Sequence, residues 1–449
     1  MIKTFHYGGI HPPDLKITAS KPVELLPLPV SVTIPLSQHA GSPATPVVTK
    51  GDKVLVGQLI GKTSGYISAN IHSSVSGTVS RIDPATDSSG YKQLSVRIDV
   101  SGDEWINTID RDPELKTDIK LSGADIIEKC REAGIVGLGG AAFPTHVKLN
   151  VPKGRTCSTL VINGAECEPY LTSDHRLMIE KGREIITGSR IMMIALGTDT
   201  AVIGIENNKP DAIKHLSDLC TEVSGISVRP LKVKYPQGGE KQLVKTLIGR
   251  EVPHGGLPID VGVVVQNVAT AYAVYEAVQK NKPLFERVVT VTGKSLSNPS
   301  NFLARVGTPV QALIDAAGGL PGDAGKIING GPMMGKSLNS SEIPVVKSMS
   351  GIVVLREEET VHRVEEPCIR CSKCITACAL KLEPYLLMAL SSKGLFEKAE
   401  QERITDCCEC GSCSFICPAS RPLLDYIRLG KATVMRMKKE INTSKTTAP

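Results

Sequence analysis

The sequence is poor in aromatic residues and lacks long apolar runs. Phe, Trp and Tyr make up 4% of the 449 residues, and there is one tryptophan. No run reaches the ~18 apolar residues that a membrane-spanning helix needs, because polar residues such as Asp199 and Gln266 interrupt the most apolar stretches. The N-terminal segment also lacks the apolar core of a signal peptide. We therefore expect a chain that does not itself span a membrane.

The sequence also has little excess charge. Its net charge is +6, without the concentrated basic face that nucleic acid binding requires, so we expect no nucleic acid partner. With 41% hydrophobic and 22% charged residues, the composition is that of a globular protein. The length is sufficient for about three or four domains. Abundant glycine (41) and proline (29) predict many turns.

What the sequence does have is cysteine in a repeated spacing. Eight of the thirteen cysteines form two copies of C-x2-C-x2-C-x3-C near the C-terminus, the run that holds [4Fe-4S] clusters in two-cluster ferredoxins. The first run consists of Cys368, Cys371, Cys374 and Cys378, and the second of Cys407, Cys410, Cys413 and Cys417. Zinc sites use cysteine pairs with a longer gap, and disulfide frameworks suit small secreted domains, so both explain the pattern less well.

The fourth cysteine of each run is predicted to bind the cluster of the other run, as in two-cluster ferredoxins. One cluster is then expected on Cys368, Cys371, Cys374 and Cys417, and the other on Cys407, Cys410, Cys413 and Cys378. Ala379 replaces the proline that often follows such a run, but that proline is not a ligand. Cys408 is interpreted as a neighbour of a cluster.

Residues 1–117 contain short β-branched runs separated by turn residues, which predicts a β domain. The stretch 47–82 resembles the small sandwich of biotinyl- and lipoyl-carrier domains. Carriers present a modified lysine on a hairpin, and residues 65–71 contain no lysine. We therefore predict a barrel-sandwich hybrid domain without a swinging arm.

Residues 118–283 alternate strand-like and helix-like segments, including one expected helix over 173–187. This alternation predicts a Rossmann-like α/β domain, whose parallel sheet binds ligands at the carboxyl ends of its strands. Residues 284–355 return to short strands and glycine-rich turns. Residues 356–430 contain an acidic linker and the cysteine runs, and the basic segment 431–449 is predicted to be a flexible tail.

The segment 134–149, GIVGLGGAAFPTHVKL, is rich in glycine. Gly137, Gly139 and Gly140 would let the backbone approach a ligand closely and offer N–H groups to a phosphate. Lys148 could add a positive charge. A glycine-rich loop alone is equally compatible with a tight turn.

Four segments resemble, in the same order, the flavin site of the NADH-oxidising subunit of respiratory complex I: residues 134–149, NGAECEPY at 163–170, YPQGGEKQL at 235–243 and VQNVAT at 265–270. The resemblance implies FMN contacts from Gly137, Gly139, Lys148, Asn163, Glu166, Tyr235, Gly238, Glu240, Asn267 and Thr270. It implies NAD(H) contacts from Phe143, Lys148, Glu168 and Glu240. Leu138, Ala165 and Gly239 stand where complex I has an arginine, an aspartate and a glutamate, which implies the loss of charged contacts.

Further segments, among them FHYGGIHPP, PLSQHAGSPATPVV, ANIHSSVSGTV and NGGPMMG, follow the order found in the RnfC subunits of Rnf complexes. The chain is identified as a member of this family, which belongs to membrane-bound ferredoxin:NAD+ oxidoreductases. The resemblance implies a peripheral subunit on the cytoplasmic face of the membrane, with FMN, two [4Fe-4S] clusters and an SLBB β-grasp domain at 284–355. It also implies electron exchange with NAD(H) and, indirectly, with ferredoxin, while partner subunits translocate Na+ or H+.

No side chain is expected to act as a nucleophile, because a flavin can exchange two electrons with a nicotinamide and single electrons with a cluster. Two alternatives remain open. One is the flavin subunit of a soluble NADH-linked hydrogenase or formate dehydrogenase. The other is a non-catalytic electron relay with clusters but without flavin.

Overall fold

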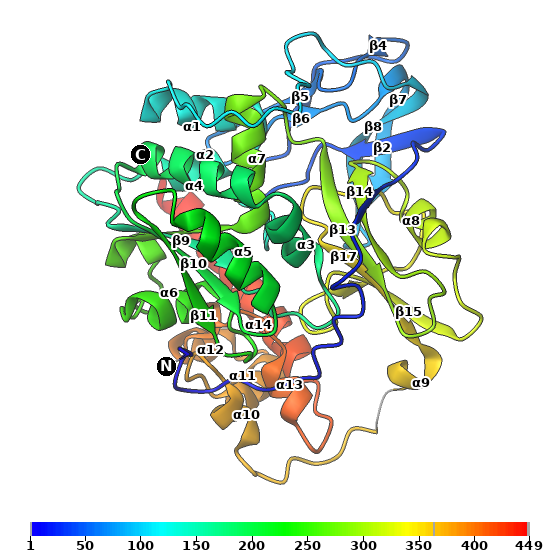
Figure 1. Cartoon of the computed structure of the whole chain (residues 1–449). Coiled ribbons are helices and arrows are strands. Elements are labelled where there is room, and N and C mark those ends of the chain that lie inside the picture. Colours follow the sequence, from blue (N-terminus) through cyan, green and yellow to red (C-terminus); the bar gives the residue numbers. More distant parts are fainter. Residues whose placement is uncertain (1, 362–363, 447–449) are drawn as a thin grey trace.

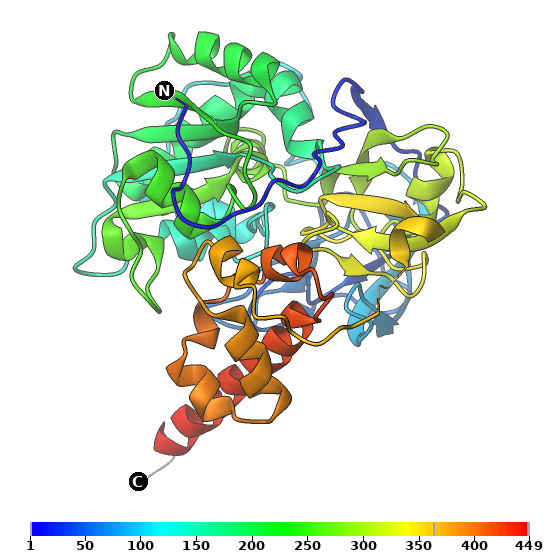
Figure 2. The same ribbon diagram turned by 90° about the horizontal axis from the view of Figure 1, so that it is seen from below.

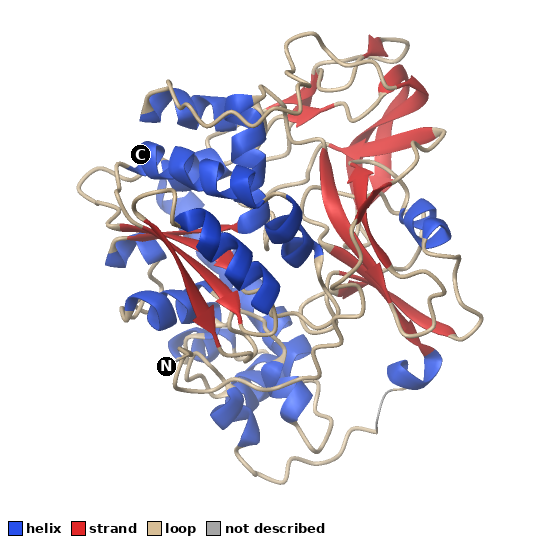
Figure 3. Cartoon of the chain, in the orientation of Figure 1, coloured by secondary structure: helices blue, strands red, loops and turns tan. Residues whose placement is uncertain are grey.

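The computed structural model describes residues 2–361 and 364–446 (Figure 1). Two β-rich domains lie beside an α/β domain, and a helical module carries the C-terminus (Figures 1 and 3). In this described part of the chain, no helix combines the length and the apolar character needed to cross a bilayer.

The N-terminal domain is built from two small antiparallel sheets. The first has the order β2 (Ser31–Pro35), β8 (Lys92–Gly102), β7 (Ser76–Thr86), β4 (Lys53–Val54), and the second β3 (Thr45–Pro46), β5 (Leu59–Lys62), β6 (Ile71–His72). Side chains alternate along each strand, so β2 turns Val32 and Ile34 into the core, where Ile60, Val79 and Ile98 join them. The two sheets thus enclose one apolar core, as the sandwich pattern predicts.

The α/β domain contains a four-stranded parallel sheet. Its order is β11 (Ile226–Leu231), β10 (Ala201–Glu206), β9 (Thr159–Gly164), β12 (Val263–Asn267). Its helices are α1 (Gly123–Glu132), α2 (Thr145–Leu149), α3 (Ser173–Glu180), α4 (Gly182–Leu196), α5 (Pro210–Cys220), α6 (Glu240–Ile248), the short η1 (Pro258–Val261) and α7 (Val268–Gln279).

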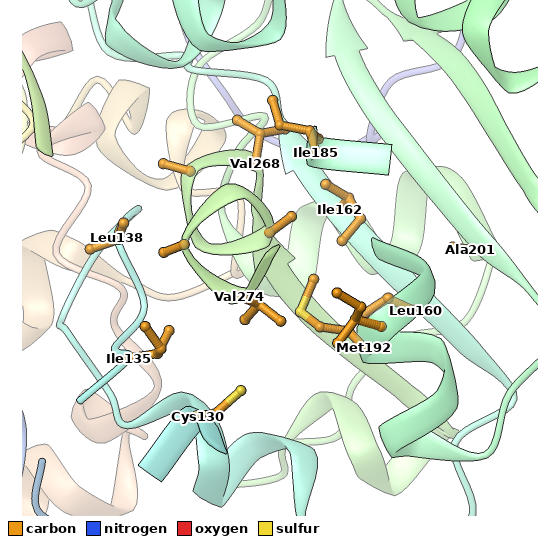
Figure 4. Close-up of a cluster of buried hydrophobic side chains, with 14 of the residues drawn as sticks. Cys130, Ile135, Leu138, Leu160, Ile162, Ile185, Met192, Ala201, Val268 and Val274 are labelled. Atoms are coloured by element: carbon orange, nitrogen blue, oxygen red, sulfur yellow. The ribbon is translucent and has the colours of Figure 1, made fainter. Parts of the chain in front are cut away.

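Both faces of this sheet are covered by helices. Leu160 and Ile162 of β9 face the larger core, which α4 and α7 complete with Met192 and Val274 (Figure 4). Val161, on the opposite face of β9, packs in the core that α6 supplies. Because helices cover both faces, ligands can reach the sheet at the carboxyl ends of its strands, here called the carboxyl edge.

The expected single helix over 173–187 is two helices, α3 and α4. The chain leaves helical geometry at Lys181 (φ −130°, ψ 30°). Gly182 then passes so close to the ring of His215 in α5 that a Cβ atom would lie 2.7 Å from Nε2. The break therefore seats the start of α4 against α5, a contact that local periodicity does not encode.

The second β-rich domain is a six-stranded mixed sheet. Its order is β1 (Val23–Leu25), β14 (Ser300–Arg305), β13 (Glu286–Thr292), β17 (Gly351–Arg356), β15 (Ala324–Asn329), β16 (Lys336–Ser337). Two helices accompany it, α8 (Val310–Ala316) and α9 (Glu357–Thr360). The edge strand β1 comes from the N-terminal part of the chain, so this segment ties two domains that are distant in sequence.

The C-terminal module, residues 364–446, is built from helices joined by loops. It contains α10 (Lys373–Ala377), α11 (Pro384–Ser392), α12 (Phe396–Gln401), η2 (Ile404–Asp406), α13 (Ser412–Ile416) and α14 (Leu423–Thr446). The prediction of a flexible tail from residue 431 is wrong as far as 446, since α14 continues through it and Val434 is buried with Leu387 and Ile427. Residues 447–449 lie outside the described residues.

Candidate functional site

The candidate flavin site is the carboxyl edge of the parallel sheet. The segments that follow β9, β11 and β12 all contain predicted contact residues, namely 163–168, 235–240 and 267–270. The glycine-rich loop 134–149 lies against the same edge through two contacts described below. Segments more than a hundred residues apart therefore meet where parallel sheets bind their ligands.

The glycine-rich loop is a tight turn fixed to α7. The N–H of Gly137 donates to the carbonyl of Phe143 (2.9 Å), and the N–H of Leu138 donates to Oγ1 of Thr270 (2.9 Å). Gly139 lies so close to Asn267 that a Cβ atom would stand 2.8 Å from its Nδ2. At Gly140, by contrast, a Cβ atom would meet nothing within 4 Å. The loop therefore presents open backbone on its exposed side.

Lys148 and Asn163 join the other strand ends to this loop. Lys148 Nζ lies 2.5 Å from Oε1 of Glu240 and donates to the carbonyl of Val265 at 3.0 Å. Asn163 Nδ2 donates to the carbonyl of Gly238 at 2.9 Å. The edge thus offers the N–H groups of Gly139 and Gly140 and an ammonium group, a set of donors that fits the phosphate of FMN.

Two of the three glutamates predicted as cofactor contacts, Glu166 and Glu168, accept hydrogen bonds from backbone N–H groups of the protein. Both carboxylate oxygens of Glu166 accept from backbone N–H groups at the start of α3, those of Asp174 (2.7 Å) and His175 (3.2 Å). The carboxylate of Glu168 accepts from the N–H groups of Met333 (3.0 Å) and Met334 (2.8 Å) in the loop 330–335. Burial raises the pKa of Glu168 to about 7. The structure therefore uses both carboxylates to hold backbone.

Three cations support the same edge and escaped the sequence analysis, the buried Arg287 and Lys209 and the half-buried Lys16. Arg287 of β13 donates to the carbonyls of Leu138 (3.4 Å) and Lys347, so a guanidinium group lies behind the position where complex I has an arginine in the loop. Lys209 Nζ donates to the carbonyl of Ala165 at 2.7 Å. Lys16 donates to three carbonyls of the segment 166–171. No local pattern marks them, because their partners are distant in sequence.

The two cysteine runs have the same backbone. Positive φ values occur at equivalent positions, at Arg370 (53°) and Ser372 (59°) in the first run and at Glu409 (58°) and Gly411 (77°) in the second. Left-handed residues other than glycine are uncommon and gather at functional sites. Each run then continues into a short helix, α10 or α13, and these two helices pack together. The repeated loop conformation indicates two equivalent binding loops.

The fourth cysteine of the first run lies with the second run. One cavity is lined by Cys378 together with Cys407, Cys408, Cys410 and Cys413. Burial raises the pKa of Cys378, and the neighbouring Cys410 adds to this shift. Among the described residues, no three Cys, His, Asp or Glu side chains could share one metal ion. A cubic [4Fe-4S] cluster does not require several side chains to meet at one metal ion, because its four thiolates bind four different irons.

The other four cysteines of the two runs differ in burial from those that line the cavity. Burial raises the pKa of Cys374, and Cys417 of the second run is among the smaller causes of this shift. Cys368 and Cys371 are exposed. Two of these four cysteines therefore lie at the surface, whereas none of the cysteines that line the cavity with Cys378 is exposed.

The deeper cysteine set borders the flavin edge. Tyr235, which is 2% exposed, packs in one apolar cluster with Cys167, Met333, Cys410 and Ala377. Burial raises the pKa of Tyr235 far above its usual range. The sheet edge and the cavity of cysteines therefore share one wall.

A second contact joins the two sites through Asp406, the residue before Cys407. Its carboxylate accepts from Nδ1 of His254 (2.8 Å) and from the N–H of Gly255 (3.0 Å), and it pairs with Lys241 of α6 at 3.4 Å. The burial of this side chain, at 7% exposed, strengthens the ion pair by excluding water.

Three family descriptions match the chain in order. Residues 3–103 match the RnfC barrel sandwich hybrid domain, residues 130–276 the Nuo51 FMN-binding domain, and residues 288–337 the SLBB domain. These matches define a flavin-type electron-transfer subunit with two accessory β domains. They confirm the predicted fold class.

Curated relatives show the family itself. The chain is 45% identical, over 96% of its length and 94% of the relative, to the C subunit of the proton-translocating ferredoxin:NAD(+) oxidoreductase complex of Clostridium ljungdahlii. It is 43% identical, over 97% and 98%, to the C subunit of the Na(+)-translocating complex of Acetobacterium woodii. It is 42% identical to the C subunit of the ion-translocating oxidoreductase complex of Klebsiella pneumoniae, of which it covers 57%. The chain belongs to the RnfC family of Rnf complex subunits.

Among solved structures, an NAD+-reducing [NiFe]-hydrogenase in the H2-reduced state is similar at a TM-score of 0.49 and 17% identity. The match covers 69% of this chain and 62% of the hydrogenase chain.

Proposed function

We propose that this chain transfers electrons between NAD(H) and the partner subunits of an ion-translocating ferredoxin:NAD+ oxidoreductase complex. FMN, when bound, supplies a carrier that exchanges two electrons with a nicotinamide and one at a time with a [4Fe-4S] cluster. The single observation that carries the proposal is the shared wall of the two sites, where Tyr235 of the flavin edge packs in one group of apolar side chains with Cys410.

Specific residues are proposed for each cofactor. FMN is held by the open glycine loop, the ammonium group of Lys148 and the backbone after β11, that is, by Gly137, Gly139, Gly140, Lys148 and Gly238. NAD(H) is contacted by Phe143 of the loop and by Glu240 of α6. The remaining predicted residues support the site from behind, because their polar atoms or their burial already engage them within the protein: Asn163, Glu166, Glu168, Tyr235, Asn267 and Thr270.

Each cluster is proposed to take three cysteines from one run and the last from the other. The deeper cluster uses Cys407, Cys410, Cys413 and Cys378, and the outer one Cys368, Cys371, Cys374 and Cys417. Electrons from ferredoxin then enter from a partner subunit at the outer cluster, pass to the deeper cluster and reach the flavin site, and electrons from NADH take the reverse path. The chain is proposed to be a peripheral subunit on the cytoplasmic face of the membrane, where NAD(H) is available.

The purified full chain tests this function. It should contain about eight irons and one extractable FMN per chain. Addition of NADH should bleach the flavin absorption band and then produce the EPR signal of reduced clusters. A protein with about eight irons and no flavin would be a relay, and the proposal would then be wrong.

A further inference from the structure

Residues 3–10 form an extended segment, here called the N-terminal strap, that runs between the α/β domain and the cysteine module. In Figures 1 and 2 it is the dark blue segment that crosses the green domain beside the orange helices. Lys3 forms a parallel bridge to Leu231, the last residue of β11, and Ile10 forms an antiparallel bridge to Tyr235 in the segment that follows β11. Both backbone hydrogen bonds between Ile10 and Tyr235 are 2.9 Å long.

Side chains fix the strap to the flavin domain along its length. Phe5 is 4% exposed, and Lys234 Nζ donates to its carbonyl (3.0 Å) and lies 4.3 Å from the centre of its ring. A cation over an aromatic face is attractive, more so where water is excluded. Thr4 Oγ1 donates to the side-chain oxygen of Gln237 at 2.9 Å. The strap is therefore a fixed part of the flavin domain.

The other side of the strap contacts the cysteine module. The N–H of Gly9 donates to the carbonyl of Ala377 at 2.9 Å, directly before Cys378. Gly8 has a φ of +73°, and a Cβ atom there would lie 2.5 Å from N of Ala379 and 2.6 Å from C of Cys378. Such distances are far below van der Waals contact, so a side chain at position 8 must displace the backbone around Cys378.

Consecutive residues of the strap thus hold the two sides of the electron path. Gly9 binds the residue before Cys378, and Ile10 binds Tyr235, which packs against Cys410. We propose that the N-terminal strap is a positioning element that fixes the distance between the flavin site and the deeper cluster. The inference rests on the proposed function, because only an electron path between these sites makes their separation matter.

The substitution Gly8→Ala tests the strap, and Gly51→Ala is the matched control. Gly51 has an even larger positive φ (+97°), but a Cβ atom there meets nothing within 4 Å. Both variants therefore impose the same kind of backbone strain, and only Gly8→Ala pushes against the cysteine loop. Small displacements of reacting groups have large kinetic effects, so we expect cluster reduction in Gly8→Ala to slow on the order of tenfold or more.

Three measurements separate the outcomes. Stopped-flow absorbance should show wild-type flavin reduction by NADH in both variants, and rapid-freeze EPR should show slowed cluster reduction in Gly8→Ala alone. Hydrogen exchange before addition of NADH should be faster over residues 373–381 in Gly8→Ala alone. Dithionite should still reduce the clusters fully. Failure of NADH to reduce the wild-type clusters would refute the proposed function itself.

Equal cluster reduction in Gly8→Ala, Gly51→Ala and wild type would overturn the inference. If Gly8→Ala loses iron, the variant Phe5→Ala tests the role of the strap in its place, because it loosens the strap without touching the cysteine loop. Slower cluster reduction in Phe5→Ala with about eight irons per chain, together with faster exchange over 373–381, supports the strap. Unchanged rates and unchanged exchange in Phe5→Ala overturn it.

Discussion

The ammonium group of Lys148 joins the glycine-rich loop to two strand ends of the sheet. It pairs with Glu240 and donates to the carbonyl of Val265, and its side chain is 29% exposed. Lys148→Ala should weaken FMN binding about tenfold, equivalent to ~1.4 kcal/mol, because a charge-assisted bond to phosphate is lost. The FMN fraction retained after dialysis, read from flavin fluorescence of the extract, measures this effect.

Lys153→Ala is the control for this experiment. Lys153 is exposed on the next turn of chain, so its loss changes the net charge by the same amount away from the site. If both variants retain the same FMN fraction, Lys148 is not a phosphate contact.

Glu168 makes stability depend on pH. Its pKa is raised from 4.5 to about 7, mainly by burial, so the folded state keeps a proton that the unfolded state releases. Its contribution to the free energy of unfolding is therefore complete below about pH 4.5 and is lost as pH rises through 7. The loss amounts to at most about 3 kcal/mol.

Glu168→Gln removes this titration. The difference in denaturation midpoint between wild type and variant, measured from pH 5 to pH 8 (about the range of the titration), should therefore change with pH. The apparent affinity for NADH should stay the same, because the carboxylate holds residues 333 and 334. A weakened affinity for NADH without a pH-dependent midpoint would show that Glu168 is a substrate contact.

At the scale of elements, most of the architecture follows from local pattern. Short β-branched runs predict β9, β10, β11 and β12, and a helix-like segment follows each of them. This alternation of strands and helices predicts the parallel sheet and the edge at which it binds ligands. The spacing of the cysteine runs likewise predicts their binding loops. These features depend on neighbours in sequence, and for this reason they are predictable.

The elements that escaped prediction depend on partners distant in sequence. The break between α3 and α4 follows from packing against His215, and the order in α14 beyond residue 431 follows from the burial of Val434 in the cysteine module. Lys16 and Arg287 read as ordinary surface cations until the fold places carbonyl groups around them. Local periodicity carries no information about such contacts.

At the scale of the whole molecule, the proposed exchange of the fourth cysteines would turn two short runs into one ordered path. Cys378→Ser and Cys417→Ser are equivalent changes in sequence, and each should lower the iron content from about eight to about four per chain. Their effects on electron flow should differ. Cys378 lines one cavity with Cys410, which packs against Tyr235, whereas Cys417 is proposed to share a cluster with the exposed Cys368 and Cys371.

In Cys417→Ser, NADH should therefore still reduce the remaining cluster, because that cluster borders the flavin site. In Cys378→Ser, NADH should reduce the flavin while the remaining cluster is reduced much more slowly, although dithionite reduces it readily. EPR of the two variants after mixing with NADH measures this asymmetry. Equal reduction in both would mean that the flavin site reaches either cluster directly, and a reversed asymmetry would place the surface cluster first in the path.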